Sequence, residues 1–240
     1  VLSRWVSFWG DWADGRYRNA AVGDQILAAQ MLTELGYYAI RMGKYVEEPV
    51  LSDNPSIIDY AYQSHDDFMD VYLSAQCAFF IGQNSGMTSL PQIFKKPVAF
   101  ANISPLSQIV YSGPRDIFIP KMYYSAEKGT LLTFREILSE KRLSDYPGRF
   151  AGAVGSQEFY QQIGLEFVDN TPEEIAELAL EMDRRLRGEF EPSPEDQSLQ
   201  ESFRDLLRSH PQVTEYGSNY DFSRLTIGSH FIRTHQDLFE

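Results

Sequence analysis

The sequence has a single cysteine, Cys77, in 240 residues, so no disulfide bond can form within the chain. Small secreted domains commonly depend on disulfides, and a chain without them fits a reducing compartment. No apolar run approaches the roughly 20 residues that a membrane-spanning helix needs. Residues 1–21 are aromatic but broken by charges, unlike the apolar core of a signal peptide. We therefore expect a cytoplasmic protein.

Basic residues are scarce, with 21 Lys and Arg against 34 Asp and Glu and a net charge of −13. Nucleic acids are polyanions that proteins hold largely with Lys and Arg, so we expect no nucleic-acid partner. Anionic lipid headgroups are also repelled by such a surface as a whole, although a local basic patch remains compatible with this charge.

The first hundred residues alternate between strand-like and helix-like patterns. Apolar runs predict strands over residues 4–9, 37–43, 56–61, 77–82 and 97–102, and helical spacing predicts helices over 22–36, 65–76 and 87–94. In the second helix this spacing places Phe68, Val71 and Tyr72 on one face. This alternation predicts an α/β fold, a Rossmann-like parallel sheet flanked by helices.

The remainder is less regular. The proline-containing segment 104–124 reads as a long excursion over the edge of the sheet, and 147–164 as a loop. A helix is predicted from Pro172, capped by Asn170 or Thr171, to Gly188, and another within 191–211. We expect a nucleotide-sugar-binding domain over residues 1–188 and a helical extension packing on it over 189–240.

A glycine-containing turn follows the predicted strand 77–82. It runs Gly82, Gln83, Asn84, Ser85, Gly86, Met87, Thr88 and leads into a helix. Free backbone N–H groups and hydroxyls at the N-terminus of a helix suit a diphosphate, and ligands of open α/β sheets lie at this edge. A capped turn without a ligand explains the same residues, since short glycine-rich loops are weak signals.

Two arginines are expected near the same edge. Arg18 precedes the first helix, and Arg41 ends the strand before Gly43. Two guanidinium groups converging there would form a phosphate clamp. The alternative for each is an ion pair with one of the many acids.

An acidic stretch offers a metal-site interpretation with Asp59, His65, Asp66 and Asp70 as ligands. Hard cations need several converging oxygens, and acids in the first turn of a helix also favour its dipole. The second interpretation is the better one, and we expect no metal ion. The four histidines show no zinc or catalytic-triad spacing.

The order of several segments resembles a bacterial family. These segments are RYRNAA, LTELGYYAIRMG, IIDYA, DDFMDVYLSAQCAFFIGQNSGMTSLPQIFKKPVAFAN and NTPEEIAELALEMDRRLRG. They are similar to surface-carbohydrate glycosyltransferases of lipopolysaccharide and capsule clusters, which have the GT-B architecture of two facing Rossmann-like domains. The resemblance implies the C-terminal, donor-binding domain. It also implies an N-terminal acceptor domain, and the start at Val1 rather than Met agrees with an expected upstream segment.

The resemblance assigns donor-binding roles to matched positions, without a cofactor or metal. These are Arg18, Asn19, Arg41, Gly43, Gly82, Gln83, Asn84, Ser85, Gly86, Met87, Thr88, Asn102 and Lys121. The implied reaction transfers a sugar from a nucleotide-diphosphate sugar to a glycan or lipid-linked acceptor, in the cytoplasm or peripherally at the inner membrane. Arg41 and Lys121 would neutralise the departing diphosphate.

The chain departs from the family near the end of the first strand. Members carry His-x-Arg there, whereas this chain has SFWGDW, so Asp11 is the one candidate for a catalytic base. Two alternatives stay open: a non-catalytic module that binds a nucleotide or sugar phosphate and needs a partner chain, or another α/β enzyme, such as an epimerase, that uses the same loop.

Overall fold

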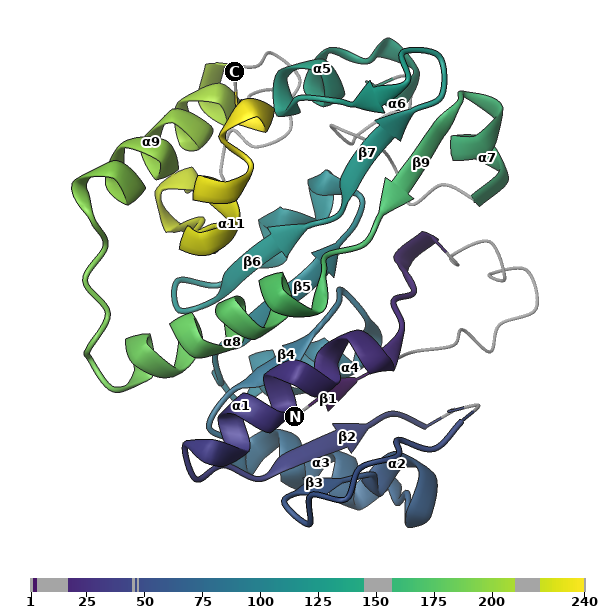
Figure 1. The fold of residues 1–240 in the computed structure, drawn as a ribbon, viewed down its shortest axis with the longest axis vertical. Helices are drawn as coiled ribbons and strands as arrows, with labels where there is room; N and C mark the ends of the chain where they lie inside the picture. Colours follow the sequence, from purple (N-terminus) through teal and green to yellow (C-terminus); the bar gives the residue numbers. More distant parts are fainter. Residues whose placement is uncertain are drawn as a thin grey trace.

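The structure is a computed structural model and describes residues 2–3, 17–44, 46, 48–144, 157–209 and 221–239. The predicted strand over residues 4–9 and the candidate base Asp11 lie outside these residues. Strands and helices alternate along the described chain, with parallel strands in the main sheet (Figure 1). The predicted α/β class is confirmed.

Six strands form one parallel sheet with the spatial order β3-β2-β1-β4-β5-β6. Their bounds are β1 (Leu2–Ser3), β2 (Ala39–Met42), β3 (Ile57–Ile58), β4 (Phe80–Gly82), β5 (Val98–Ile103) and β6 (Ile117–Pro120). β4, β5 and β6 are buried throughout, which explains why they are unbroken apolar runs in the sequence. This strand order is the one found in doubly wound nucleotide-binding sheets and is consistent with a Rossmann-like fold.

Helices cover both faces of this sheet. α1 (Ile26–Glu34), which continues the 3-10 helix η2 (Val22–Gln25), packs beside α8 (Pro172–Leu186) on one face. α3 (Asp67–Gln76) and α4 (Gly86–Ile93) pack together on the opposite face (Figure 1). All four correspond to predicted helices. Thr171 rather than Asn170 caps α8, because its hydroxyl accepts a hydrogen bond from the N–H of Glu174.

The apolar face of α3 points away from the core. Phe68 is 72% exposed, and Val71 and Tyr72 are also exposed. The core side of this helix carries the buried Asp70 and Ser74, and the half-buried Met69 and Leu73 pack against the core. The helical period was therefore predicted correctly, but it does not reveal which side of the helix is buried.

The proline-containing segment 104–124 was wrongly predicted as an excursion over the edge. It contains the buried strand β6 and the start of β7, and a proline ends β6, where no further N–H is needed from the strand. β7 (Met122–Ser125) belongs to a second, antiparallel sheet of order β8-β7-β9, with β8 (Thr130–Leu131) and β9 (Leu165–Val168). Shorter elements in this region are η3 (Leu106–Tyr111), α5 (Phe134–Ser139), α6 (Lys141–Ser144) and α7 (Gln157–Gln162), and α7 shows that part of the predicted loop 147–164 is helical. α2 (Tyr60–Gln63) follows β3 and contacts β2.

The C-terminal segment packs on β6 and α8. It contains α9 (Pro194–Ser209), η4 (Phe222–Arg224), α11 (Ser229–Thr234) and η5 (Gln236–Phe239). The N–H of Phe118 donates to the carbonyl of Thr226, and the N–H of Gly228 donates back to Phe118. The segment thus extends the sheet beside β6 and shares its hydrophobic core. The predicted domain boundary at residue 188 stays a prediction.

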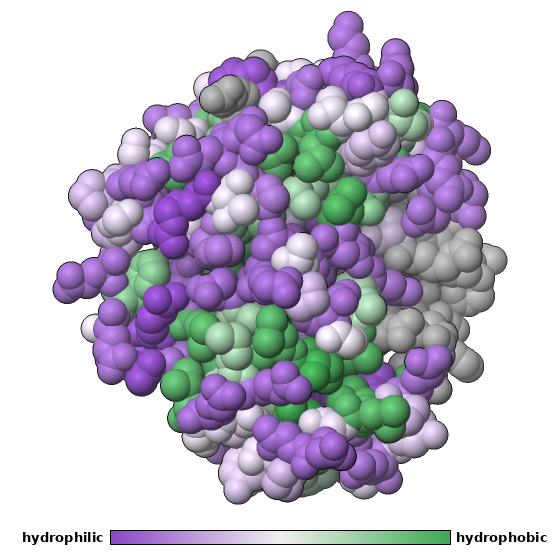
Figure 2. All heavy atoms as spheres, in the orientation of Figure 1, coloured by the Kyte–Doolittle hydropathy of each residue, from purple (hydrophilic) through white to green (hydrophobic). Residues whose placement is uncertain are grey.

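The surface is mainly polar on the side that carries α1 and α8. Figure 2 shows hydrophilic residues over most of this face, with hydrophobic atoms gathered where α1 lies. Within the described residues, each helix is too short or too polar to cross a bilayer.

Candidate functional site

The carboxyl ends of the six parallel strands lie along one edge of the sheet, here called the carboxyl edge, on the right in Figure 1. β1 stands between β2 and β4, and Leu2 is level with Arg41 on one side and Ile81 on the other. Arg41 and Gly82 therefore lie at the same edge, separated by β1. The direction of strand succession reverses at this point, where open α/β sheets bind their ligands.

Arg41 is buried at this edge, with 1% of its surface exposed. Its Nη1 donates to both carboxylate oxygens of Asp59, at 3.2 and 3.1 Å, and to the carbonyl of Glu48 at 2.7 Å. The carboxylate also accepts from the N–H of Val50. Nε and Nη2 of Arg41 are buried and have no hydrogen-bond partner among the described residues. Arg41 thus forms a structural ion pair with Asp59, while its Nε and Nη2 hydrogen-bond donors remain available.

Arg18 lies next to Tyr17, whose ring is packed in an aromatic cluster. The ring of Tyr17 packs among Tyr160 and Phe167, with ring centroids 5.0 and 5.3 Å away. The Arg18 guanidinium lies 5.9 Å from the Tyr17 ring, and its Nε is buried without a partner among the described residues. Since no ion pair within the described chain occupies Arg18, its guanidinium can meet an anion.

Lys121 follows β6 and is committed to the protein itself. It is 2% exposed, and its Nζ lies 2.7 Å from Oδ1 of Asp169 and 2.6 Å from the carbonyl oxygen of Asn19. Burial lowers the pKa of Lys121 below its ordinary value, while Asp169 opposes this effect. The carboxylate of Asp169 therefore competes with a leaving diphosphate for the ammonium group of Lys121. Instead, Lys121 ties the segment that carries Arg18 to the end of β6.

In the turn after β4, Asn84 forms hydrogen bonds at the end of the next strand, β5, whereas the side-chain oxygen of Gln83 has no hydrogen-bond partner among the described residues. Nδ2 of Asn84 donates to the carbonyl of Ser104 at 2.8 Å, and the N–H of Ser104 donates back at 3.1 Å. These bonds join the ends of β4 and β5. Gln83, 3% exposed, has a buried Oε1 that accepts no hydrogen bond. Gly82 is buried in the sheet itself.

The N-terminus of α4 begins directly after this turn. The N–H of Ser85 donates to Oγ1 of Thr88, which donates to the carbonyl of Ser85. Oγ of Ser85 is buried and faces the N–H of Thr88 in a capping box. Met87 and Thr88 are buried and pack the helix against the fold. A Cβ on Gly86 would meet no atom within 4 Å, so the space above the helix N-terminus is open and the fold alone does not require glycine there.

Two further predicted residues have clear backbone roles. Gly43 has a φ of 144°, a conformation that favours glycine, where the chain leaves β2. Asn102 has a φ of 57°, which asparagine tolerates better than most residues. Its N–H and side-chain oxygen exchange 2.6 Å hydrogen bonds with Asn170, which fixes β5 to the start of α8. Nδ2 of Asn102 remains unpartnered.

The carboxyl edge therefore collects buried polar atoms without partners. Within the described residues they are Nε of Arg18, Nε and Nη2 of Arg41, Oε1 of Gln83, Nδ2 of Asn102 and Oγ of Ser104. Most buried polar groups in proteins are hydrogen-bonded, so a group of exceptions needs an explanation. A polar ligand bound at this edge is one explanation.

Asp24 and Ser104, which no sequence pattern singled out, also lie at this edge. Burial raises the pKa of Asp24 above its ordinary value, the nearby Asp169 raises it further, and Lys121 lowers it. A carboxylate with a raised pKa in such a position suits proton transfer. Asp24 carried no sequence signal, because an acid in the first turn of a helix is ordinary.

The alternative metal ligands separate in the structure. Asp59 pairs with Arg41, and Asp66 caps α3 through the N–H groups of Phe68 and Met69. A different set, His65, Asp67 and Asp70, lies together, with Nε2 of His65 3.0 Å from Oδ2 of Asp70. Asp67 already pairs with Lys44 at 2.8 Å, so a cation there would compete with an ammonium group.

No model of a protein family, curated protein or solved structure matches this chain.

Proposed function

We propose that the carboxyl edge binds a nucleotide-diphosphate sugar and that the chain is the donor-binding part of a metal-independent GT-B-type glycosyltransferase. The observation that carries this proposal is the group of buried, unpartnered polar atoms at the point where the strand order reverses. The diphosphate would lie over the N-terminus of α4, whose N–H groups and dipole favour an anion. The open space above Gly86 admits it.

Among the described residues, Arg18 is the main source of positive charge for the proposed diphosphate site. Arg41 adds its free Nε and Nη2 donors, while Asp59 neutralises its charge. Gln83 and Ser104 offer a carbonyl and a hydroxyl for the sugar or ribose. One charged group together with neutral hydrogen-bonding groups would recognise the shape of a charged ligand as well as its charge.

Transfer breaks the bond between the anomeric carbon and the diphosphate oxygen, which leaves with the electron pair. An acceptor hydroxyl, from a glycan or a lipid-linked sugar, forms the new bond and loses its proton. Arg18 and the helix N-terminus would stabilise the leaving diphosphate electrostatically. Asp24 supplies a proton acceptor at the same edge, and Asp11 is the alternative.

A second candidate function is supported by one observation. Arg41 and Lys121, the cations expected at the leaving group, each have a carboxylate partner. A module that binds the nucleotide sugar without cleaving it needs less positive charge. Such a module would work with a partner chain that completes the transferase.

Two measurements test these functions. Thermal shift with UDP, GDP, CMP and ADP in parallel should reveal a stabilising nucleotide, because a ligand that binds only the folded state raises its melting temperature. Arg18→Gln should abolish that shift, whereas the exposed Lys128→Gln should preserve it. A chain stabilised by none of the four nucleotides would contradict donor binding.

Hydrolysis of the matching nucleotide sugar separates the two candidates. A transferase slowly hydrolyses its nucleotide sugar when water takes the place of the acceptor. Arg18→Gln should reduce the rate of nucleotide release by this hydrolysis at least tenfold. Equal release by the wild type and Arg18→Gln, with nucleotide binding retained in the wild type, would favour the binding module.

A further inference from the structure

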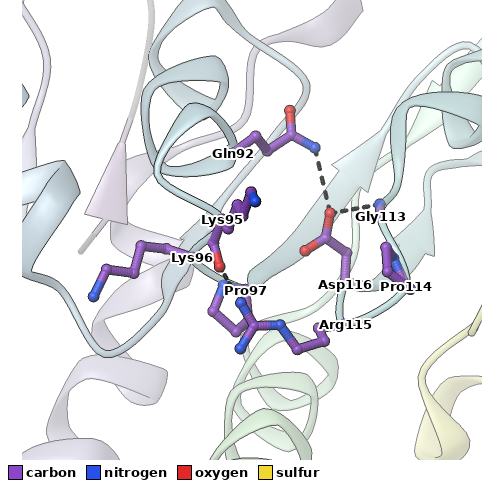
Figure 3. Close-up of a pocket in the computed structure, with 8 residues that line it drawn as sticks. All are labelled: Gln92, Lys95, Lys96, Pro97, Gly113, Pro114, Arg115 and Asp116. Atoms are coloured by element: carbon purple, nitrogen blue, oxygen red, sulfur yellow. Dashed lines mark hydrogen bonds between the residues drawn. The ribbon is translucent and has the colours of Figure 1, made fainter.

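A cavity lies at the amino edge of the sheet, opposite the carboxyl edge. It is lined by residues 95–97 and 113–116 together with Gln92 and has a volume of about 310 Å³ (Figure 3). These segments precede β5 and β6, so the length of β5, about 20 Å, separates this cavity from the proposed donor site. The cavity belongs to no part of the function proposed above.

Three cations surround this cavity in a strongly acidic chain. They are Lys95, Lys96 and Arg115, and none forms an ion pair with a carboxylate in the described part of the chain. Arg115 donates to the backbone carbonyl of Lys95, which holds the two segments together. Figure 3 shows the Lys96 side chain extending away from Asp116. The local surface is therefore positive although the net charge of the chain is −13.

The carboxylate of Asp116, in the cavity wall, accepts hydrogen bonds from within the protein. Oδ1 of Asp116 accepts from the N–H of Val98 at 2.8 Å, and Oδ2 accepts from the N–H of Gly113 at 2.7 Å and from Gln92 at 3.3 Å (Figure 3). Asp116 is buried and directed into these bonds. It positions the 113–116 segment and leaves the cations available to an external anion.

Two exposed apolar residues directly precede the two lysines in the chain. Ile93, the last residue of α4, is 70% exposed, and Phe94 is 39% exposed. The sequence thus runs from an exposed apolar pair into a pair of lysines, with Arg115 across the cavity. Exposed apolar groups next to Lys and Arg are typical of surfaces that enter the interface of a bilayer.

We propose that this amino-edge surface docks the chain on an anionic lipid bilayer. Ile93 and Phe94 would enter the headgroup region, and Lys95, Lys96 and Arg115 would contact lipid phosphates. The cavity is large enough for a headgroup, and the exposed apolar pair that precedes the lysines favours lipid over an acidic protein segment. The acidic remainder of the chain is screened beyond about 8 Å at physiological salt.

This docking places the carboxyl edge on the side of the sheet that faces away from the bilayer. The inference does not depend on the proposed function, because it uses a separate surface and separate residues.

Sedimentation of the whole chain with vesicles tests the proposal. The wild type should bind vesicles of equal parts phosphatidylglycerol and phosphatidylcholine, bind pure phosphatidylcholine weakly, and dissociate as salt is raised. Each cation near an anionic membrane contributes about a fivefold increase in affinity. Lys95→Glu/Lys96→Glu should therefore reduce binding by about 25-fold or more, and Ile93→Ser/Phe94→Ser by at least tenfold.

Matched variants control for charge and for exposed apolar area. Lys128→Glu/Arg135→Glu reverses two exposed charges elsewhere, and Phe68→Ser/Val71→Ser removes two exposed apolar side chains from α3; both should bind as the wild type does. All variants change exposed or half-buried side chains, and an unchanged melting temperature shows that each is folded. Failure of the wild type to bind anionic vesicles would overturn the proposal, as would equal losses in the control variants.

Glycerol phosphate distinguishes a bilayer from a small anion. If it stabilises the wild type but not Lys95→Glu/Lys96→Glu, and anionic vesicles do not bind, the cavity takes a soluble anion and the bilayer proposal is wrong. Vesicle binding that is lost in this variant, and that glycerol phosphate does not displace, supports docking on the membrane.

Discussion

Nη1 of Arg41 lies 3.1 Å from Oδ2 of Asp59, and both side chains are almost completely buried where β2 ends. The pair connects β2 to the residue that follows β3, and Asp59 also holds the N–H of Val50. A buried ion pair is organised by geometry and is strongly sensitive to the loss of one partner.

Asp59→Asn should therefore destabilise the fold. Removing the carboxylate leaves the buried guanidinium without a counter-ion, which typically lowers the free energy of unfolding by about 3 kcal/mol. Urea denaturation measures this change. Lys44→Met removes the exposed pair with Asp67 and should change stability by less than about 1 kcal/mol. Similar small effects for both variants would show that the buried pair is not structural.

Gln83→Leu should stabilise the free protein and abolish nucleotide binding. The substitution replaces a buried, unpartnered carbonyl by an apolar group of similar size, which should raise the free energy of unfolding by about 1 kcal/mol. The exposed Gln76→Leu is the matched control and should alter neither property. Urea denaturation and nucleotide thermal shift give the two readouts. A destabilised Gln83→Leu that still binds nucleotide would mean that Gln83 has a purely structural role.

Gly86→Ala should separate folding from ligand binding. The added methyl group meets no protein atom within 4 Å, so the melting temperature without ligand should stay the same or rise slightly. The same methyl group would stand in the space proposed for the diphosphate, and nucleotide affinity should fall at least tenfold. Ser89→Ala, on the exposed side of α4, should leave affinity unchanged. Undiminished affinity in Gly86→Ala would move the diphosphate away from this helix.

Glu174→Gln should change the dependence of stability on pH. Burial alone would raise the pKa of Glu174, but hydrogen bonds from His235 and from the N–H of Thr171 outweigh it, and the pKa is lowered. A carboxylate whose pKa is lowered by folding stabilises the protein above its unfolded pKa of about 4.3 and loses this effect as pH falls through its folded pKa.

The variant should thus be less stable than the wild type by about 1 kcal/mol at neutral pH and nearly equal to it in strong acid, as measured by urea denaturation at both pH values. The exposed Glu173→Gln provides the control, since it should behave as the wild type does at both. A Glu174→Gln deficit that persists unchanged in acid would exclude the ionic contribution.

The sequence determined the α/β class and the main elements of the sheet and its helices. Buried parallel strands need continuous apolar runs, and the helices that cover them need apolar residues at the 3.6-residue period. Both patterns are local in the sequence, so both elements can be predicted from it. The turn after Gly82 and the cap of α8 were also readable, because helix N-termini select small polar residues and proline.

Only the tertiary structure decided how the charged residues are used. Arg41 is paired with Asp59 and Lys121 with Asp169, and neither pairing has a fixed spacing along the chain. The outward face of α3 and the strand β6 hidden among prolines were likewise settled by packing. Periodicity and composition describe each segment alone, whereas the partner of a side chain depends on which segments the sheet brings together.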